Sequence, residues 1–272
     1  MSRRASLFDF LGARAAAFAV VLFLYGPIIV LVALSFNASD TALASWHGAS
    51  LRWYRAVAAD DDMLRAVRTS LIVASVATSV GTVIAVLAAL GTSGARFRRQ
   101  GAFEALVGLP LIVPDVVAAI SILLLLVAIG LPLGLISLML AHSVFAIPVA
   151  YLPVRARLAG LDPLLGEAAA DLGARPTTSF RRILLPLLWP GIASGAMLAF
   201  IGSLGDVVIS YFVSGPGSTT LPVYVFSMVR MGVTPEVNAI STILVAVSAV
   251  LLSGSYLLGR RLGGPSAVGR IA

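Results

Sequence analysis

Six long apolar runs limit what this chain can fold into more than any other feature. They cover residues 15–36, 64–92, 103–129, 134–154, 187–213 and 239–258. A helix of about 20 apolar residues crosses the roughly 30 Å hydrocarbon core of a bilayer. Only helices and closed barrels satisfy every backbone polar group in lipid. The sequence therefore predicts an all-α membrane protein with six transmembrane helices.

The composition agrees and excludes several kinds of chemistry. Apolar residues make up 59% of the chain and charged residues 11%, against roughly half and a quarter in soluble domains. All 19 basic residues are Arg, and there is no Cys. Disulfides, thiolate metal sites and the P-loop lysine are therefore absent from the sequence. We expect no metal, no cofactor and no catalytic centre in this chain. Its Arg residues form short clusters rather than a basic stripe, so we expect no nucleic-acid partner.

The apolar runs also define the expected organisation. We expect a tail over residues 1–14, a membrane domain over 15–258 and a second tail over 259–272. The first run could instead belong to a cleaved signal peptide, but it exceeds the usual apolar core of about 7–15 residues. The apolar segment 221–231 is too short to span, and we expect it to lie at or dip into the interface.

The Arg distribution predicts the orientation in the membrane. Six spans place both termini on one side, and 14 of the 19 Arg residues lie on that side. Cytoplasmic loops carry the excess of positive residues. Both termini and the long polar segment 155–182 are therefore expected in the cytoplasm.

That polar segment contains the most specific motif in the chain. Glu167, Ala168, Ala169 and Gly173 are followed, after nine residues, by Ile183, Leu185 and Pro186. This spacing resembles the signature of permease subunits in binding-protein-dependent (type I) ABC importers. The resemblance implies short cytoplasmic coupling helices over residues 158–186 that dock into a groove on an ATPase subunit.

The residue types in the motif fit two short helices. Pro163 and Glu167 suit a helix N-terminus. Gly173 suits the position after a helix, where φ is positive. Thr177 or Ser179 could cap a second helix that continues into the membrane. The alternative is an ordinary amphipathic loop.

Further segments resemble the second permease subunit of spermidine/putrescine importers. They are Asn37, Trp53-Tyr54, residues 114–117, residues 204–208 and residues 227–239. The resemblance implies a bacterial inner-membrane heterodimer with a sister permease. It also implies two ATPase subunits, which bind the ATP and Mg, and an external binding protein that delivers cargo. One departure is Gly205, where the family usually shows an Asp.

Asp115 and Asp206 are the carboxylates that lie farthest inside the predicted membrane runs. A membrane-buried acid is costly and usually faces a cavity, a pathway or a partner, so we expect both to compensate a cationic cargo. Asp115 could instead cap a helix that restarts after Pro114. Trp46, Tyr211 and Tyr224 could add cation–π contacts, or could anchor membrane interfaces.

Two other kinds of residue interrupt the apolar runs. Pro110 and Pro114 fall in the third run, and Pro148 and Pro153 in the fourth. Broken helices are tolerated where they line a cavity or pack within protein. His142 is the lone histidine of the runs, and we expect a packed, hydrogen-bonded side chain rather than a metal ligand.

The sequence as a whole favours an ATP-driven importer subunit for polyamines. A permease for a phosphonate or an amino-acid-like solute is the nearest alternative. An ion-gradient-driven transporter would be expected to carry internal repeats, which the chain does not show. A membrane enzyme would need a nucleophile with its base or an aspartyl pair, and neither Asp has such a context.

Overall fold

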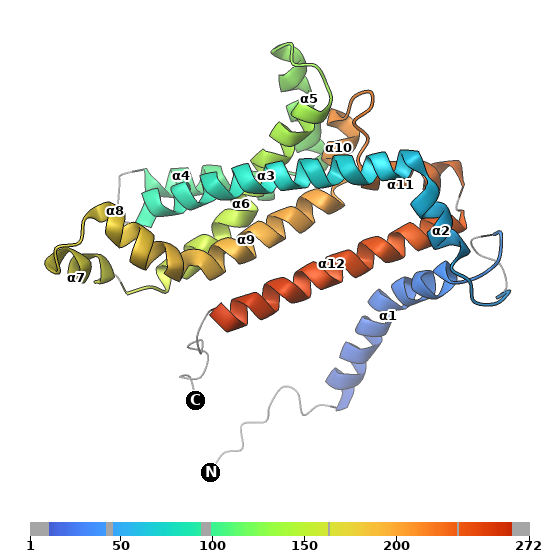
Figure 1. Ribbon diagram of the computed structural model, residues 1–272, viewed down its shortest axis with the longest axis horizontal. Helices are drawn as coiled ribbons and strands as arrows, with labels where there is room; N and C mark the ends of the chain where they lie inside the picture. Colours follow the sequence, from blue (N-terminus) through green and yellow to red (C-terminus); the bar gives the residue numbers. More distant parts are fainter. Residues whose placement is uncertain (1–10, 42–45, 94–98, 163, 233, 263–272) are drawn as a thin grey trace. The chain divides into compact units, whose positions relative to one another are not determined.

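The computed structural model describes residues 11–41, 46–93, 99–162, 164–232 and 234–262. These residues form twelve α-helices with one 3₁₀ turn and one π turn between them. Their only β pairing is an isolated bridge between Asn37 and Ala49. The prediction of an all-α protein is confirmed (Figure 1).

Within the described residues, five helical segments are long and apolar enough to cross a membrane. They are Arg14–Ser35 within α1 (Leu11–Ser35), α3 (Asp61–Ser93), α6 (Leu135–Ala159), Pro176–Gly205, and Pro235–Gly254 within α12 (Pro235–Leu262). A sixth exists only if two bent helices form one span, Gln100–Leu111 with Asp115–Ala128. Five of the six predicted runs are thus represented by long helices.

The third run is broken at its prolines, as the sequence predicts, and does not form one continuous helix. It contains α4 (Gln100–Gly108), a 3₁₀ turn (Leu109–Leu111) and α5 (Asp115–Ala128), with a bend of 101° at the break. Proline has no backbone N–H, so Pro114 cannot donate the hydrogen bond that a residue inside a helix makes. Its ring also disfavours helical geometry at the preceding residue. The two prolines therefore end one helix and begin another.

The fifth run is also broken, at a place that carries no proline. Helix α9 spans Leu185–Gly205, Asp206 is extended at φ −71° and ψ 127°, and α10 spans Val208–Val213. The predicted single helix over 187–213 is wrong at this residue. Between the first two runs, the polar segment forms α2 (Arg52–Ala59), which the sequence did not predict.

The chain divides into two compact units. The first comprises Met1–Asp61 and Ser227–Ala246, and the second Asp62–Phe226 and Val247–Ala272. In the first unit, Asn37 organises the polar segment. Its Oδ1 accepts from the His47 N–H at 2.9 Å, and its carbonyl accepts from the Trp53 indole N–H at 3.1 Å. The Tyr54 hydroxyl lies 2.6 Å from the Ser35 hydroxyl.

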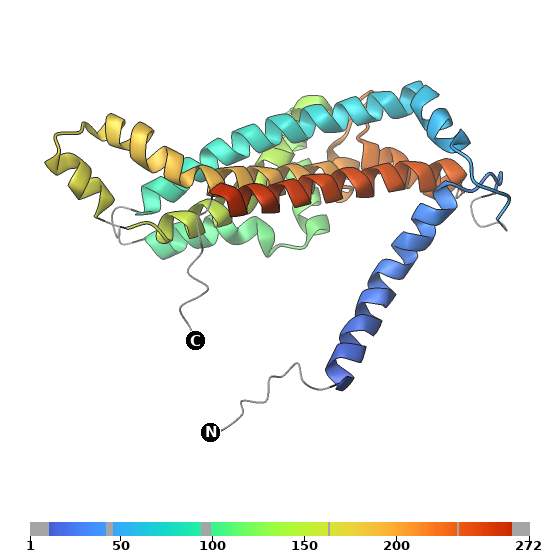
Figure 2. The same cartoon turned by 60° about the horizontal axis from the view of Figure 1, so that its bottom comes forward.

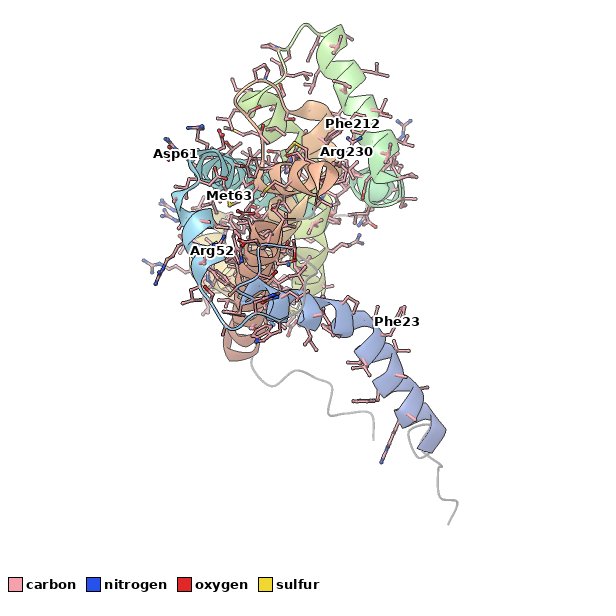
Figure 3. The ribbon with its side chains drawn as sticks, turned by 90° about the vertical axis from the view of Figure 1, so that its right-hand side faces the viewer. Phe23, Arg52, Asp61, Met63, Phe212 and Arg230 are labelled. Atoms are coloured by element: carbon pink, nitrogen blue, oxygen red, sulfur yellow. The ribbon has the colours of Figure 1, made fainter. Side chains whose placement is uncertain are left out.

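Helix α1 is apolar around its whole circumference. None of the residues in its most apolar window is buried within the chain, and Phe23 projects with 81% of its surface exposed (Figure 3). A helix with apolar residues on all sides needs an apolar environment around it. Lipid contact satisfies this requirement.

One hydrophobic core of the second unit is shared by α3, α6 and α9, which run alongside one another (Figure 1). Small residues allow the backbones to approach closely. A Cβ added at Gly195 of α9 would lie 2.7 Å from the Ala150 carbonyl oxygen of α6. A Cβ at Gly81 of α3 would lie 2.5 Å from the Ala146 Cβ of α6. These contacts hold α6 between its two neighbours.

Candidate functional site

Two short helices lie where the sequence motif predicts them. Helix α7 covers Leu165–Asp171, with Glu167 exposed in its first turn and Ala169 buried. Gly173 has a φ of +77°, and its N–H donates to the Ala170 carbonyl at 2.8 Å. The Ala174 N–H donates to the Ala169 carbonyl at 3.0 Å. This pair of bonds is the Schellman ending of a helix, so the predicted role of Gly173 is confirmed.

The second short helix, α8, spans Pro176–Ser179 and starts differently from the prediction. Its N-cap residue is Arg175 in an extended conformation, and Pro176 occupies the first helical position. Proline suits this position because the missing N–H would have no partner inside the helix. Thr177 and Ser179 lie within α8, so their predicted role as caps is wrong. Pro163 lies outside the described residues.

Helix α8 continues through a π turn into the membrane helix. The π turn covers Phe180–Leu184 and leads directly into α9 at Leu185. Ile183 and Leu185 are half-buried, and Pro186 is exposed in the first turn of α9. Figure 2 shows α7 and α8 folded into a hairpin at the end of α9. We call residues 165–186 the coupling hairpin.

A cavity of about 630 Å³ lies between the coupling hairpin and the ends of two long helices. Its lining includes Glu167 of α7, Ile183 of the π turn, Thr92 of α3 and Arg155 of α6. Arg155 pairs with Glu104 of α4 at 2.7 Å. This ion pair connects α4 to α6 beside the hairpin.

Exposed leucines flank α7. The exposed fraction is 60% for Leu164 and 89% for Leu172. Together with the exposed Glu167 and Ala168 they form a mixed apolar and acidic surface on one small element. Such a surface suits contact with another protein.

The two predicted pathway carboxylates have different surroundings. Asp115 is exposed at the first helical position of α5, and the N-cap residue is Pro114 rather than Asp115. The alternative capping role of Asp115 is therefore not formed. Its charge still complements the helix N-terminus.

Asp206 lies in the break between α9 and α10 and is held on several sides. Its Oδ2 accepts from the Ser210 N–H at 2.8 Å, and its Oδ1 lies 3.4 Å from the Ile209 nitrogen. The carboxylate thus caps α10, a local role that the sequence analysis did not assign. Its side chain remains 18% exposed.

The predicted packed, hydrogen-bonded role of His142 is confirmed. Its Nδ1 lies 2.7 Å from the Ser203 Oγ of α9, and its Nε2 lies 3.1 Å from the Ser210 Oγ of α10. The same Nε2 is 3.6 Å from the Asp206 Oδ2. This association of His142 with Asp206 was missed. The spacing of Ser203, Asp206 and Ser210, three and four residues apart, was the available signal, because it places polar groups on one side of a helix.

The predicted aromatic residues lie in different local surroundings. Tyr211 is half-exposed and makes edge contacts with Phe212 and Phe226 at centroid distances of 5.8 and 6.1 Å. Tyr224 is half-buried in α11 (Leu221–Met231). Trp46 belongs to the first unit and is 57% exposed, whereas the two tyrosines belong to the second. Within the described residues no His, Asp and Glu cluster could hold a metal ion.

Comparisons with known proteins agree with one another. The family model described as "Binding-protein-dependent transport system inner membrane component" matches residues 81–263. The spermidine/putrescine transport system permease protein PotC of Haemophilus influenzae is 41% identical over 244 residues, covering 90% of this chain and 95% of that protein. The putrescine transport system permease protein PotI of Escherichia coli is 44% identical over 246 residues, covering 88% and 87%.

Solved structures show the same fold at lower sequence identity. A chain of a bacterial ABC transporter that imports alginate has a TM-score of 0.70 at 18% identity, covering 93% of this chain and 96% of that chain. A chain of the MetNI methionine ABC transporter has a TM-score of 0.63 at 20% identity, covering 74% and 95%. These similarities establish the architecture only.

Proposed function

The chain belongs to the inner-membrane components of binding-protein-dependent transport systems, and from this premise we propose that it is the permease subunit through which an ABC importer moves polyamines. The observation that supports polyamines as the cargo is the 41–44% identity with polyamine permeases over about nine-tenths of the chain. This similarity extends over nearly the whole length of these relatives, which supports a shared membrane pathway.

The proposed partners follow from the family and from the absence of an ATP-binding P-loop lysine in the sequence. A sister permease completes the pathway, and an external binding protein delivers the cargo. Two ATPase subunits bind ATP and Mg, since this sequence has no Lys for a P-loop. The chain is a multi-pass protein of the bacterial inner membrane with both termini in the cytoplasm. The Arg distribution supports this orientation.

The coupling hairpin is the proposed link to ATP. Gly173 ends α7 in a tight turn, and α8 runs through the π turn into α9. Because the helix is continuous from Pro176 to Gly205, a movement of the hairpin would be carried along α9 toward Asp206. Closure of the ATPase dimer would draw the hairpin inward and open the pathway to the outside. Hydrolysis would return it.

The proposed cargo contacts are anionic and aromatic. Polyamines are flexible polycations that lose hydration in a membrane pathway. Asp206 and Asp115 would compensate the ammonium groups, and Trp46, Tyr211 and Tyr224 would offer aromatic faces worth about 0.5–2 kcal/mol each. With Gly205 at the preceding position, Asp206 acts without a neighbouring carboxylate.

The direct test is uptake by the complete transporter in proteoliposomes. Labelled putrescine and spermidine are supplied with the binding protein, with and without ATP, and methionine serves as a control without the polyamine charge. We expect ATP-dependent uptake of at least one polyamine and no methionine uptake. Uptake of neither polyamine would overturn the cargo. Uptake by this chain alone without ATP would overturn the energy source.

A further inference from the structure

A histidine of α6 makes hydrogen bonds to both sides of the break between α9 and α10. His142 points from the middle of α6, and its side chain is only 2% exposed. Its two ring nitrogens contact hydroxyls on both sides of the break, Ser203 before it and Ser210 after it. Each hydroxyl can donate or accept a hydrogen bond, so both nitrogens are satisfied in either neutral tautomer.

The two oxygens of the Asp206 carboxylate have different hydrogen-bond partners. Oδ2 accepts from the Ser210 N–H at 2.8 Å and lies 3.6 Å from the His142 Nε2. Oδ1 has only the Ile209 N–H, at 3.4 Å, which is a long hydrogen bond. Oδ2 is thus held by the protein, while Oδ1 keeps acceptor capacity.

The surroundings of His142 leave Asp206 as its main electrostatic partner. Among the described residues, Asp206 is the one acidic residue whose carboxylate comes within 4.0 Å of the His142 ring, with its Oδ2 at 3.6 Å from the Nε2. The neighbouring positions of α5 and α6 in this core are apolar, including Ala119, Leu138 and Ala141. A charged partner in such surroundings is weakly screened. Changes at His142 therefore reach the Asp206 carboxylate through the break that carries Ser203 and Ser210.

We propose that His142 is the positioning residue for cargo recognition at Asp206. The imidazole is hydrogen-bonded to Ser203 and Ser210 and so fixes the break. There the Ser210 N–H holds Oδ2, and Oδ1 is presented to an ammonium group of the cargo. The assignment rests on the proposed polyamine function. His142 acts through Asp206 and does not itself bind the cargo.

A double-mutant cycle tests this assignment in the complete transporter in proteoliposomes. The quantity measured is putrescine transported per ATP hydrolysed, at saturating binding protein. Both His142→Gln and Asp206→Asn are expected to lower this ratio about tenfold, the scale of one hydrogen bond to a charged group. The double variant is expected to fall no further than about twofold below Asp206→Asn alone, because residues that act as a pair are not additive.

Two variants serve as matched controls. His47→Gln removes the other histidine of the chain, which lies in the first unit. Ser143→Ala changes the neighbour of His142, whose hydroxyl donates to the Met139 carbonyl of its own helix. Both should keep the wild-type ratio.

The possible results separate this assignment from the function on which it rests. Absence of polyamine uptake by the wild-type complex refutes the proposed function. Normal wild-type uptake with an unchanged ratio in His142→Gln refutes the positioning role, as does a further tenfold loss when His142→Gln is added to Asp206→Asn. If His142→Gln does not assemble, Ser203→Ala and Ser210→Ala remove the two anchors separately. Each should lower the ratio, and an unchanged ratio in both would overturn the proposal.

Discussion

The coupling hairpin and the α9–α10 break are two of the places where the second unit departs from straight helices. The hairpin is exposed and is shaped by contacts between residues close in sequence, such as Gly173 with Ala170. The break is enclosed and is shaped by His142, which lies more than 60 positions from Ser203 and Ser210. Local sequence thus determines the geometry of the hairpin, whereas contacts with a distant residue determine the geometry of the break.

The two regions also differ in what they can contact. The hairpin exposes Glu167 and Leu172, on the element that we propose contacts the ATPase subunit. The break holds a carboxylate that is mostly covered but retains one oxygen with acceptor capacity. A defect at the hairpin should impair both ATP hydrolysis and uptake, whereas a defect at the break should separate the two.

The largest effect is expected at Gly173. A Val at φ +77° costs about 1–2 kcal/mol or more, a factor of about 5–30 in the population of the native turn. Gly173→Val should therefore reduce uptake and cargo-stimulated ATP hydrolysis together by at least about that factor. Gly166→Ala is the control, because Gly166 lies in α7 with open space at its Cβ. Normal coupled uptake in Gly173→Val would show that the turn does not matter for coupling.

Removing the charge of Asp206 should lower transport more than removing the charge of Asp115. Asp206→Asn should lower putrescine transported per ATP by about tenfold, because it removes a charge that is partly enclosed. Asp115→Asn should change the ratio less than about threefold, because its carboxyl is exposed and screened. Competition between putrescine and spermidine gives a second measurement. Unchanged discrimination in Asp206→Asn would exclude this residue as a selectivity element.

The packing that supports the break can be tested at Gly195. A Cβ there would lie 2.7 Å from the Ala150 carbonyl oxygen, and overpacking of this kind costs about 1–3 kcal/mol. Gly195→Ala should lower the thermal unfolding temperature of the purified complex. Gly202→Ala, in the same helix with no atom near its Cβ, should leave this temperature unchanged or raise it. Equal temperatures for the two variants would contradict the close approach of α6 and α9.

The smallest effect is expected at Thr177. Since Arg175 is the N-cap residue of α8 and Thr177 lies inside the helix, Thr177→Ala should change stability by less than about 0.5 kcal/mol. Uptake should equal that of the wild type. A loss of about 1 kcal/mol, the usual cost of removing a cap, would restore the capping role that the sequence suggested.

The parts of the fold that follow from local chemistry were predictable. Apolar length predicted the long helices, Pro114 predicted an interruption of the third run, and Gly173 predicted a positive φ. Residue preferences within a few positions decide these features. The same preferences misplaced the start of α8, because Pro176 at the first helical position was overlooked.

The break at Asp206 could not be predicted in the same way. Residues 187–213 are apolar with no proline near position 206, so periodicity indicates one helix. The helix ends at Gly205 because the Asp206 carboxylate caps α10 and His142 holds both sides of the break. A contact between distant positions has no signature in hydropathy, although the polar spacing of Ser203, Asp206 and Ser210 was visible.

The account depends on contact between the coupling hairpin and an ATPase subunit in the cytoplasm. The chain has no Cys, so a single Ala170→Cys on the exposed surface of α7 provides one reactive site. Membrane-impermeant thiol labelling and cross-linking in the complete transporter then report its side and its neighbour. We predict labelling from the cytoplasmic side alone and a cross-link to the ATPase subunit. Labelling from the outside, or no cross-link to the ATPase, would contradict the central claim.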